Sequence, residues 1–158
     1  IIFVPARISP LKQDVESTSP EHRLMMTKLA LEAYPQFSVS DFEINNMGVS
    51  YTINTLKHFK YLYKNIELII GYDNYLVFDK WHMWEEILEL ANIVVLKRLT
   101  EGKNESKILS DKFIFVNTPT IEITSTSIRE RYNKNLPIDL LVTNNVLNYI
   151  TENKLYKK

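Results

Sequence analysis

The sequence predicts an α/β domain with a mainly parallel β-sheet flanked by helices. Two observations support this fold class: short apolar runs alternate with segments of helical periodicity, and no repeat or change in composition divides the chain. The 158 residues are 45% hydrophobic and 24% charged, values typical of a globular protein with one sizeable core. We therefore expect residues 1–158 to form a single domain.

The N-terminal part predicts a strand, a loop and a helix. Residues 1–4 are apolar and mostly β-branched, which favours a strand, and Pro5 ends it. A loop rich in Ser and Pro follows as far as Ser19. Pro20 then takes the first position of a helix, where proline is favoured, and this helix stops before Pro35. Its expected apolar face is formed by Leu24, Met25, Leu29 and Leu31.

The next part predicts a strand, a turn and a second helix. Residues 37–44 alternate between apolar and polar side chains, as a half-buried strand does, and residues 45–50 predict a turn. The helix is expected over residues 51–64, because apolar side chains recur there at helical spacing. These side chains are Ile53, Leu56, Phe59 (with Lys60 as the alternative position) and Tyr63.

The middle of the chain continues the alternation. Residues 66–71 predict a short apolar strand. Residues 72–91 predict a short helix and a second helix, separated by a junction at Lys80 and Trp81. A further strand is expected over residues 92–98, followed by a polar loop.

The C-terminal part predicts one more strand and a helical end. Residues 112–117 form the strand, and residues 136–156 predict two helices joined near Thr143. Ligands of parallel α/β sheets bind at the carboxyl ends of the strands. The residues expected at those ends are Pro5 to Lys12, Gly71 to Asp73, Arg98 and the hydroxyl residues Thr124 to Ser127.

Charge and cysteine content argue against several classes of protein. Lys+Arg and Asp+Glu both number 19, so the chain lacks the basic surplus of a broad nucleic-acid surface. No cysteine is present, which excludes disulfides and thiolate metal sites and fits a cytoplasmic protein. No apolar run approaches the ~20 residues of a membrane span. The three histidines lack metal-ligand spacing, so no protein-held metal is predicted.

The stretch Thr124–Ser127 places consecutive hydroxyl residues just before Arg129. Ser127 and Glu130 have the spacing of a capping box, so we expect a helix to begin near Thr126. The free N–H groups and positive dipole end of a helix start suit a phosphate, and Arg129 would add a charged fork one turn later. An ordinary helix cap with solvated arginines is the commoner alternative.

Other candidate residues also have two interpretations. Gly71 lets backbone approach a ligand closely and Asp73 could accept from ribose hydroxyls, or the pair forms a strand-ending turn. Trp81 could stack on a flat ring or belong to the core. Lys12 and Arg98 could each reach a phosphate or be solvated. The chain contains no G-x-G-x-x-G and no Walker loop, which argues against a dehydrogenase or a P-loop enzyme.

Taken in order, several stretches resemble bacterial nicotinate-nucleotide adenylyltransferases of the nucleotidyltransferase superfamily. The resemblance covers nearly the whole chain, and it depends on the order of the stretches more than on any one of them. The stretches are "IIFVPARISPLK", "EHRLMMTKLAL", "VSDFEINNMGVSYTINTL", "LIIGYDNYLVFDKWHMWEEIL", "ITSTSIRER" and "VLNYITENKLY". The resemblance implies a Rossmann-like nucleotidyltransferase fold with a helical C-terminal part.

The resemblance also implies a reaction and a set of site residues. ATP and nicotinate mononucleotide would give deamido-NAD and pyrophosphate, with Mg²⁺ on the phosphates. The implied ATP-binding residues are Gly71, Asp73, Arg98, Thr124, Ser125, Thr126 and Arg129, of which Thr126 and Arg129 would be catalytic. The implied mononucleotide-binding residues are Lys12, Ser50, Tyr51, Thr52, Trp81 and His82. Trp81 would stack on the pyridine ring, and the His82 backbone N–H would face the carboxylate.

Departures from the family pattern leave alternatives open. The glycine-rich start and H-x-G-H motif of the superfamily are absent, so we expect natural residues to precede Ile1 and the 158 residues alone to be inactive. The loop has Leu11 where many members have His, and Leu99 follows Arg98 where Pro is usual. A pantetheine-phosphate adenylyltransferase and a non-catalytic nucleotide-binding module are the alternatives. A cytoplasmic protein is expected, and a homo-oligomer is compatible with the resemblance.

Overall fold

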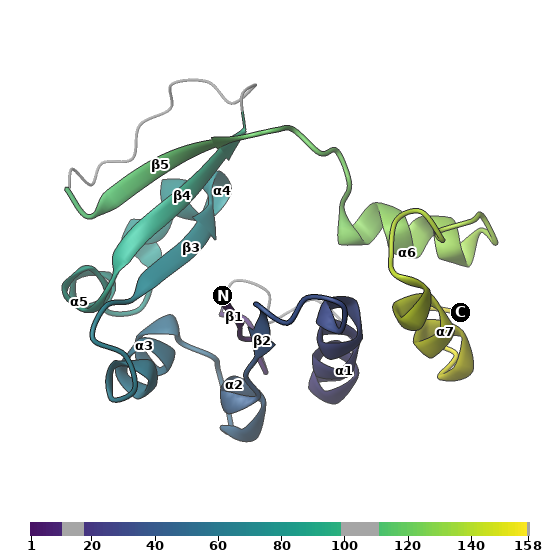
Figure 1. Ribbon diagram of the computed structural model, residues 1–158, viewed down its shortest axis with the longest axis horizontal. Helices are drawn as coiled ribbons and strands as arrows, with labels where there is room; N and C mark the ends of the chain where they lie inside the picture. Colours follow the sequence, from purple (N-terminus) through teal and green to yellow (C-terminus); the bar gives the residue numbers. More distant parts are fainter. Residues whose placement is uncertain (11–17, 99–110, 158) are drawn as a thin grey trace. The chain divides into compact units, whose positions relative to one another are not determined.

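A computed structural model describes residues 1–10, 18–98 and 111–157, which form two compact units (Figure 1). Unit 1 comprises residues 1–50 and 122–158, and unit 2 comprises residues 51–121. Each unit contains parallel strands flanked by helices, as the sequence predicts (Figure 1). The expectation of a single domain stays a prediction.

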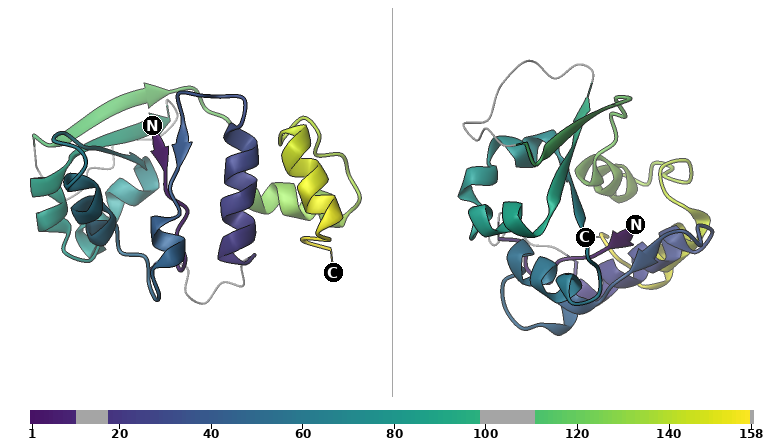
Figure 2. Two further views of the ribbon diagram at one scale, coloured as in Figure 1. Left: turned by 60° about the horizontal axis from the view of Figure 1, so that its bottom comes forward. Right: turned by 60° about the vertical axis from the view of Figure 1, so that its left-hand side comes forward.

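Unit 1 begins with a short parallel sheet and a long helix. Strand β1 (Ile2–Phe3) pairs in parallel with β2 (Ser38–Val39), and helix α1 (Pro20–Leu31) connects them. The start of α1 is as predicted, because Ser19 caps the helix by accepting from the His22 backbone N–H at 3.3 Å and Pro20 takes the first helical position. Figure 2 shows α1 beside β2.

The strand predicted over residues 37–44 is wrong beyond its first residues. Strand β2 ends at Val39, and Phe42–Asn45 forms the short helix α2. The reason is local hydrogen bonding by polar side chains. Ser40 Oγ accepts from the Phe42 backbone N–H at 3.2 Å, and Asn46 Nδ2 donates to the Phe42 carbonyl at 2.6 Å, so both side chains favour a helical turn over an extended strand.

Helices α6 (Ser125–Asn133) and α7 (Asn144–Glu152) complete unit 1. Its small core is centred on the buried residues Ile138, Val146 and Ile150. The helix expected before Thr143 is wrong, because the backbone N–H groups of Leu141 and Val142 both donate to the Ile138 carbonyl and form a turn.

The predicted apolar face of α1 needs one correction. Met25 is 43% exposed, whereas its neighbour Met26 packs on the core of unit 1 together with Leu29 and Ala30. Positions 26, 29 and 30 are spaced so that they share one helix face. The helix is therefore rotated by one residue relative to the face that the sequence suggested.

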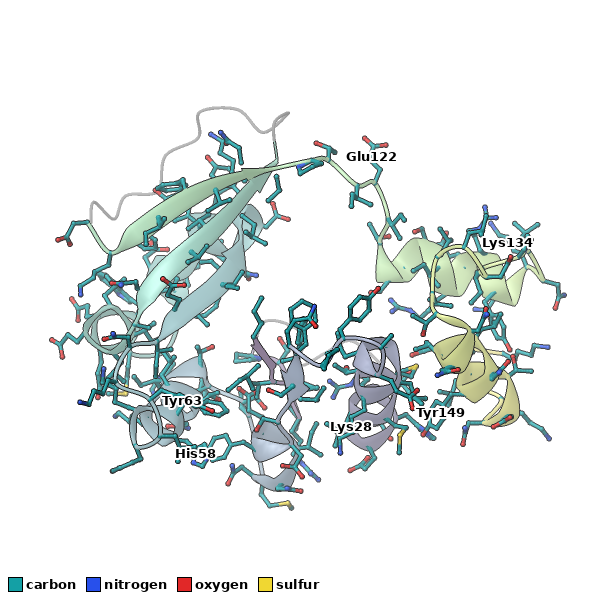
Figure 3. The ribbon with its side chains drawn as sticks, viewed as in Figure 1. Lys28, His58, Tyr63, Glu122, Lys134 and Tyr149 are labelled. Carbon is teal, nitrogen blue, oxygen red and sulfur yellow. The ribbon has the colours of Figure 1, made fainter. Side chains whose placement is uncertain are left out.

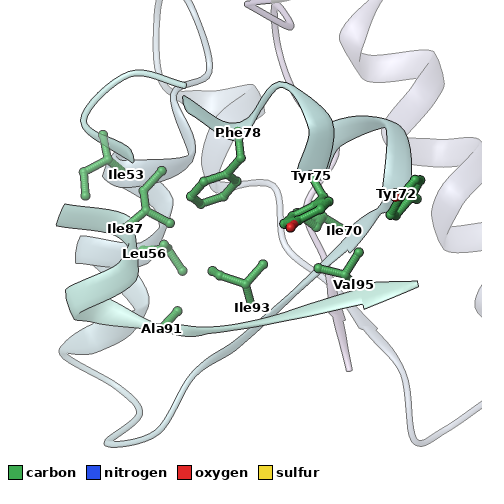
Figure 4. Packing of buried hydrophobic residues seen from close by; sticks show 10 residues of the cluster. All are labelled: Ile53, Leu56, Ile70, Tyr72, Tyr75, Phe78, Ile87, Ala91, Ile93 and Val95. Atoms are coloured by element: carbon green, nitrogen blue, oxygen red, sulfur yellow. The ribbon is translucent and has the colours of Figure 1, made fainter. Parts of the chain in front are cut away.

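Unit 2 contains a three-stranded parallel sheet in the order β3 (Glu67–Gly71), β4 (Asn92–Arg98) and β5 (Phe113–Thr118). Helices α3 (Thr52–Lys60), α4 (Tyr72–Leu76) and α5 (Trp84–Leu90), with the 3₁₀ helix η1 (Phe78–Lys80), complete this unit. Side chains from the helices gather against Ile70, Ile93 and Val95 of the sheet, with Phe78 and Ile87 fully buried among them (Figure 4).

Helix α3 is shorter than the sequence predicts. It ends at Lys60, whose Nζ donates to the Lys64 carbonyl at 2.8 Å in the turn that follows. Ile53 and Leu56 are buried as expected, but Tyr63 lies beyond the helix and is 48% exposed. The backbone N–H groups of Tyr61 and Leu62 donate to carbonyls three residues earlier, and this tighter turn ends the helix.

The carboxyl ends of the three strands of unit 2 share one edge of its sheet. Gly71 pairs with Leu96, and Arg98 pairs with Thr118. Helix α4 follows Gly71 without a loop, so its first turn lies directly at this edge. Among the described residues, no helix has both the length and the apolar character that a membrane crossing requires.

Candidate functional site

The hydroxyl residues form the start of α6, but the cap is not the one that the sequence suggested. Thr124 is the N-cap, and its Oγ1 accepts from the Ser127 backbone N–H at 3.0 Å. Ser127 Oγ in turn accepts from the Thr124 backbone N–H at 3.2 Å. The predicted box from Ser127 to Glu130 is wrong, because serine itself fills the place usually taken by Glu or Gln three residues after the cap.

This cap divides the hydroxyls into two groups. Thr124 and Ser127 hold the helix start, whereas Ser125 is exposed and has no hydrogen-bond partner among the described residues. Thr126 Oγ1 accepts from Nη2 of Arg129 at 3.2 Å, so the guanidinium folds back toward the first turn. Ser125, Thr126 and Arg129 thus lie together at the positive end of α6, an arrangement suited to an anion.

A cavity of about 850 Å³ in unit 1 adjoins this helix start. Ser125, Arg129, Arg23 and Tyr156 line it, with apolar residues of α1, α7 and the turn before α7 making up most of the rest. The cavity therefore offers the Arg129 guanidinium and the free Ser125 hydroxyl against an apolar wall, whereas the Arg23 guanidinium is engaged with backbone carbonyls. Such a lining fits a ligand with one charged and one apolar part.

Arg23 is a structural residue that the sequence did not single out. Its guanidinium donates to the carbonyls of Ala6 at 2.6 Å, Arg7 at 2.8 Å and Thr18 at 3.1 Å. Burial lowers the pKa of Arg23 from its ordinary value, with the nearby Glu21 opposing that shift. The sequence feature that could have indicated this role is the position of Arg23, one helical turn before Met26 and Thr27 and so on the packed face of α1.

Ser50 is tied to the chain segment that follows β1. Its Oγ accepts from the Arg7 backbone N–H at 2.8 Å, and its own backbone N–H donates to the Ile8 carbonyl at 2.9 Å. Arg7 also donates through Nη1 to the Ile44 carbonyl at 2.6 Å. The Ser50 hydroxyl therefore fixes the loop that leads toward Lys12, while keeping its own proton to donate.

Unit 2 brings Tyr51 and His82 together. Their ring centroids lie 4.5 Å apart with a 40° angle between the planes. Thr52 is the first residue of α3, one residue later than predicted, and no side chain caps that helix. The two segments expected around the pyridine ring thus meet in the fold, although they are about thirty residues apart in sequence.

The second helix expected after the junction at Lys80 and Trp81 begins a few residues beyond it. Helix α5 begins at Trp84, because Met83 adopts the left-handed region with φ of 55° and directs the chain into the helix. Within the described part of the chain, the backbone N–H groups of His82 and Met83 have no hydrogen-bond acceptor. Two backbone donors therefore remain available in the segment whose His82 ring contacts Tyr51.

Trp81 packs on the core of unit 2. Its ring lies 5.1 Å from that of Phe78 at 30°, and its Nε1 is buried without a partner among the described residues. Gly71 has φ of −75°, and a Cβ added there would meet no atom within 4 Å. The fold itself therefore does not require glycine at position 71. Asp73 is exposed in the first turn of α4.

Two candidate residues lie wholly or partly outside the described part of the chain. Lys12 lies outside the described residues, and for Arg98 the structure describes the backbone at the end of β4 but not the side chain. Among the described residues, no group of three His, Cys, Asp or Glu side chains is arranged to hold a metal ion.

Comparison with known proteins gives a consistent set of relatives. A family model described as cytidylyltransferase-like matches residues 1–131. A probable nicotinate-nucleotide adenylyltransferase from Hydrogenobaculum sp. (strain Y04AAS1) is 39% identical over 160 residues, which cover 100% of this chain and 82% of the relative. The nicotinate-nucleotide adenylyltransferase of Bacillus subtilis (strain 168) is 35% identical over 159 residues, which cover 99% of this chain and 82% of the relative.

Solved structures share the fold. Plasmodium falciparum nicotinic acid mononucleotide adenylyltransferase complexed with NaAD matches with a TM-score of 0.74 and 19% identity, covering 98% of this chain and 81% of that one. The same protein complexed with APC matches with a TM-score of 0.71 and 18% identity, with the same coverage. These likenesses confirm the predicted fold class.

Proposed function

The chain belongs to the cytidylyltransferase-like family and, within it, to the nicotinate-nucleotide adenylyltransferases, and we propose that it makes deamido-NAD from ATP and nicotinate mononucleotide. In this reaction a phosphate oxygen of the mononucleotide attacks the α-phosphorus of ATP. The bond from that phosphorus to the bridging oxygen of the β-phosphate breaks, and pyrophosphate leaves. The product enters NAD biosynthesis.

The observation that carries the proposal is identity along the full chain. Relatives of this name are 34–39% identical to this protein over nearly its whole sequence. The position of the phosphate-type motif adds support, since Ser125, Thr126 and Arg129 lie together at an open helix start. The reaction needs no protein nucleophile, so catalysis consists of in-line positioning and charge neutralisation.

We assign the triphosphate to the start of α6. Ser125 donates its free hydroxyl, and Arg129 neutralises phosphate charge. Thr126 orients the Arg129 guanidinium and the phosphates, and Thr124 contributes by holding the helix start as its cap. The ribose and adenine side is assigned to Gly71, Asp73 and Arg98 at the carboxyl edge of the unit 2 sheet, where ligands of parallel sheets bind.

We assign the pyridine ring to the segment around Tyr51 and His82. The free N–H groups of His82 and Met83, with the uncapped start of α3 at Thr52, supply donors for the nicotinate carboxylate. The remaining assignments are Trp81 for stacking on the ring, and Lys12 and Ser50 for binding the mononucleotide.

Mg²⁺ is proposed to enter as part of the ATP substrate, bound to phosphate oxygens and water, which are common ligands of this ion. Its charge would offset the charge that develops on the leaving pyrophosphate. A cytoplasmic location is proposed for the protein, in keeping with its lack of cysteine.

The experiment that tests the function is a product assay on the full-length protein. We expect ATP and nicotinate mononucleotide to yield the dinucleotide and pyrophosphate in equal amounts, with no product when either substrate is omitted. Tight ATP binding without any dinucleotide would refute the proposal and favour a non-catalytic nucleotide-binding protein.

A further inference from the structure

The chain turns back on itself after α7. Lys154 and Tyr156 both adopt positive φ, of 51° and 63°, and the Leu155 backbone N–H donates to the Ile150 carbonyl at 3.0 Å. Positive φ is uncommon for a residue with a large side chain and carries a conformational cost. Contacts elsewhere must therefore hold Tyr156 in place.

Those contacts run to α6 and α1. The Tyr156 ring centroid lies 6.0 Å from the Arg129 guanidinium carbon, and Lys157 Nζ lies 5.6 Å from the ring of Tyr132. Arg129 and Tyr132 are three residues apart and share one face of α6. Tyr156 OH also donates to Met26 Sδ at 3.9 Å, so the ring is fixed from two sides.

The Arg129 guanidinium is thus held without being neutralised. Its polar contact is the Thr126 hydroxyl at 3.2 Å, and within the described ranges no carboxylate forms an ion pair with it. An aromatic face attracts a guanidinium yet leaves its full charge in place. A carboxylate in the same position would compete with an incoming anion.

We propose that Tyr156 is a positioning residue that holds the Arg129 guanidinium at the cavity beside the start of α6, ready for the phosphates of ATP. Tyr156 and Arg129 both line that cavity, together with Ser125. This inference rests on the proposed function, because it takes ATP phosphate as the anion. It assigns the turn after α7 a role in substrate binding rather than in packing alone.

The test is a double-mutant cycle on the full-length protein, with the Kd for Mg-ATP measured by calorimetry and the KM values measured by turnover. Tyr156→Leu removes the aromatic face but keeps an apolar side chain, and we expect the Kd and KM for ATP to rise about two- to fivefold. The KM for nicotinate mononucleotide should not change. In an Arg129→Ala background, Tyr156→Leu should have no further effect on ATP.

Two further variants separate positioning from packing. Tyr156→Phe keeps the ring and should restore ATP affinity. Tyr149→Leu removes a neighbouring tyrosine, labelled in Figure 3, that contacts His22 instead of Arg129. It should lower the melting temperature without raising the Kd for ATP.

Three outcomes would overturn the inference. These are a loss of ATP affinity that adds to that of Arg129→Ala, an equal rise in the KM of both substrates, and a Tyr156→Phe variant as weak as Tyr156→Leu. Failure of the proposed function has a different signature, since the unmodified protein would then bind ATP without forming dinucleotide while the binding cycle still reports on Tyr156.

Discussion

Gly48 and Gly71 are glycines for different physical reasons. Gly48 has φ of 94°, which L side chains rarely adopt, whereas Gly71 has an ordinary φ of −75° and open space where a Cβ would lie. Gly48→Ala should therefore lower the free energy of unfolding by about 1–2 kcal/mol. Gly71→Ala should leave it unchanged or raise it by roughly 0.4–1 kcal/mol, because alanine restricts the unfolded chain.

Activity should follow the opposite order. The new methyl group at position 71 would occupy the open space at the end of β3, where we place a nucleotide, so Gly71→Ala should lower kcat/KM. Gly48→Ala should keep turnover per folded molecule. Urea denaturation and steady-state assays of both variants provide the comparison, and a fully active Gly71→Ala variant would remove position 71 from the site.

Trp81 contributes to both the core and the proposed pyridine site. Its ring packs against Phe78, so Trp81→Ala should lower stability as well as weaken binding. Stacking would be similar for the acid and amide forms of the mononucleotide, so their affinity ratio should be largely kept. Binding of both forms by the variant, measured well below its melting temperature, checks this expectation. A changed ratio would show that Trp81 selects the ring substituent.

Among the elements, the start of α6 contains one serine that we expect to stabilise the fold and another that we expect to bind ATP. Ser127 is half of the capping box, and Ser127→Ala should lower the free energy of unfolding by about 0.5–2 kcal/mol. Ser125→Ala is the matched control, since its exposed hydroxyl makes no hydrogen bond with the described residues. That variant should keep its stability and lose ATP affinity. Reversed effects would contradict the division of the hydroxyls.

The elements show why sequence patterns succeed in some places and fail in others. Strand β4 spans Asn92–Arg98 as predicted, because a buried apolar run between polar segments has few other conformations. Residues 42–45 fold as a helix against their alternating pattern, because Ser40 and Asn46 supply local hydrogen bonds. The spacing of apolar residues indicates which side chains are buried, but it does not indicate short-range polar hydrogen bonds of this kind.

The same limit applies to the site. The motif around Thr124 to Arg129 predicted a helix start with an arginine nearby, and this is confirmed. The contact between Arg129 and Tyr156 joins residues far apart in the sequence, so no local pattern could indicate it. The role of Arg23 was not predicted for a related reason: its guanidinium donates to backbone carbonyls that only the fold brings together.

At the scale of the molecule, each unit has its own core. Phe78 is fully buried in unit 2, so Phe78→Ala should cost about 3–5 kcal/mol and unfold that unit at moderate temperature. Tyr61→Ala is the control, because Tyr61 is 91% exposed and little should change. Thermal denaturation followed by circular dichroism gives both values, and an unchanged melting temperature for Phe78→Ala would contradict the packing described here.

The protein acts on the acid form of the pyridine mononucleotide. The described site offers backbone N–H donors at His82, Met83 and the start of α3, which suit a carboxylate. An amide would place its own NH₂ donors against them and leave polar groups poorly paired, and sites of this kind can reject a mismatched analogue strongly. The decisive measurement is kcat/KM of the full-length protein for nicotinate and nicotinamide mononucleotide, each with saturating Mg-ATP. We predict a strong preference for the acid, whereas equal efficiency on both would contradict the account.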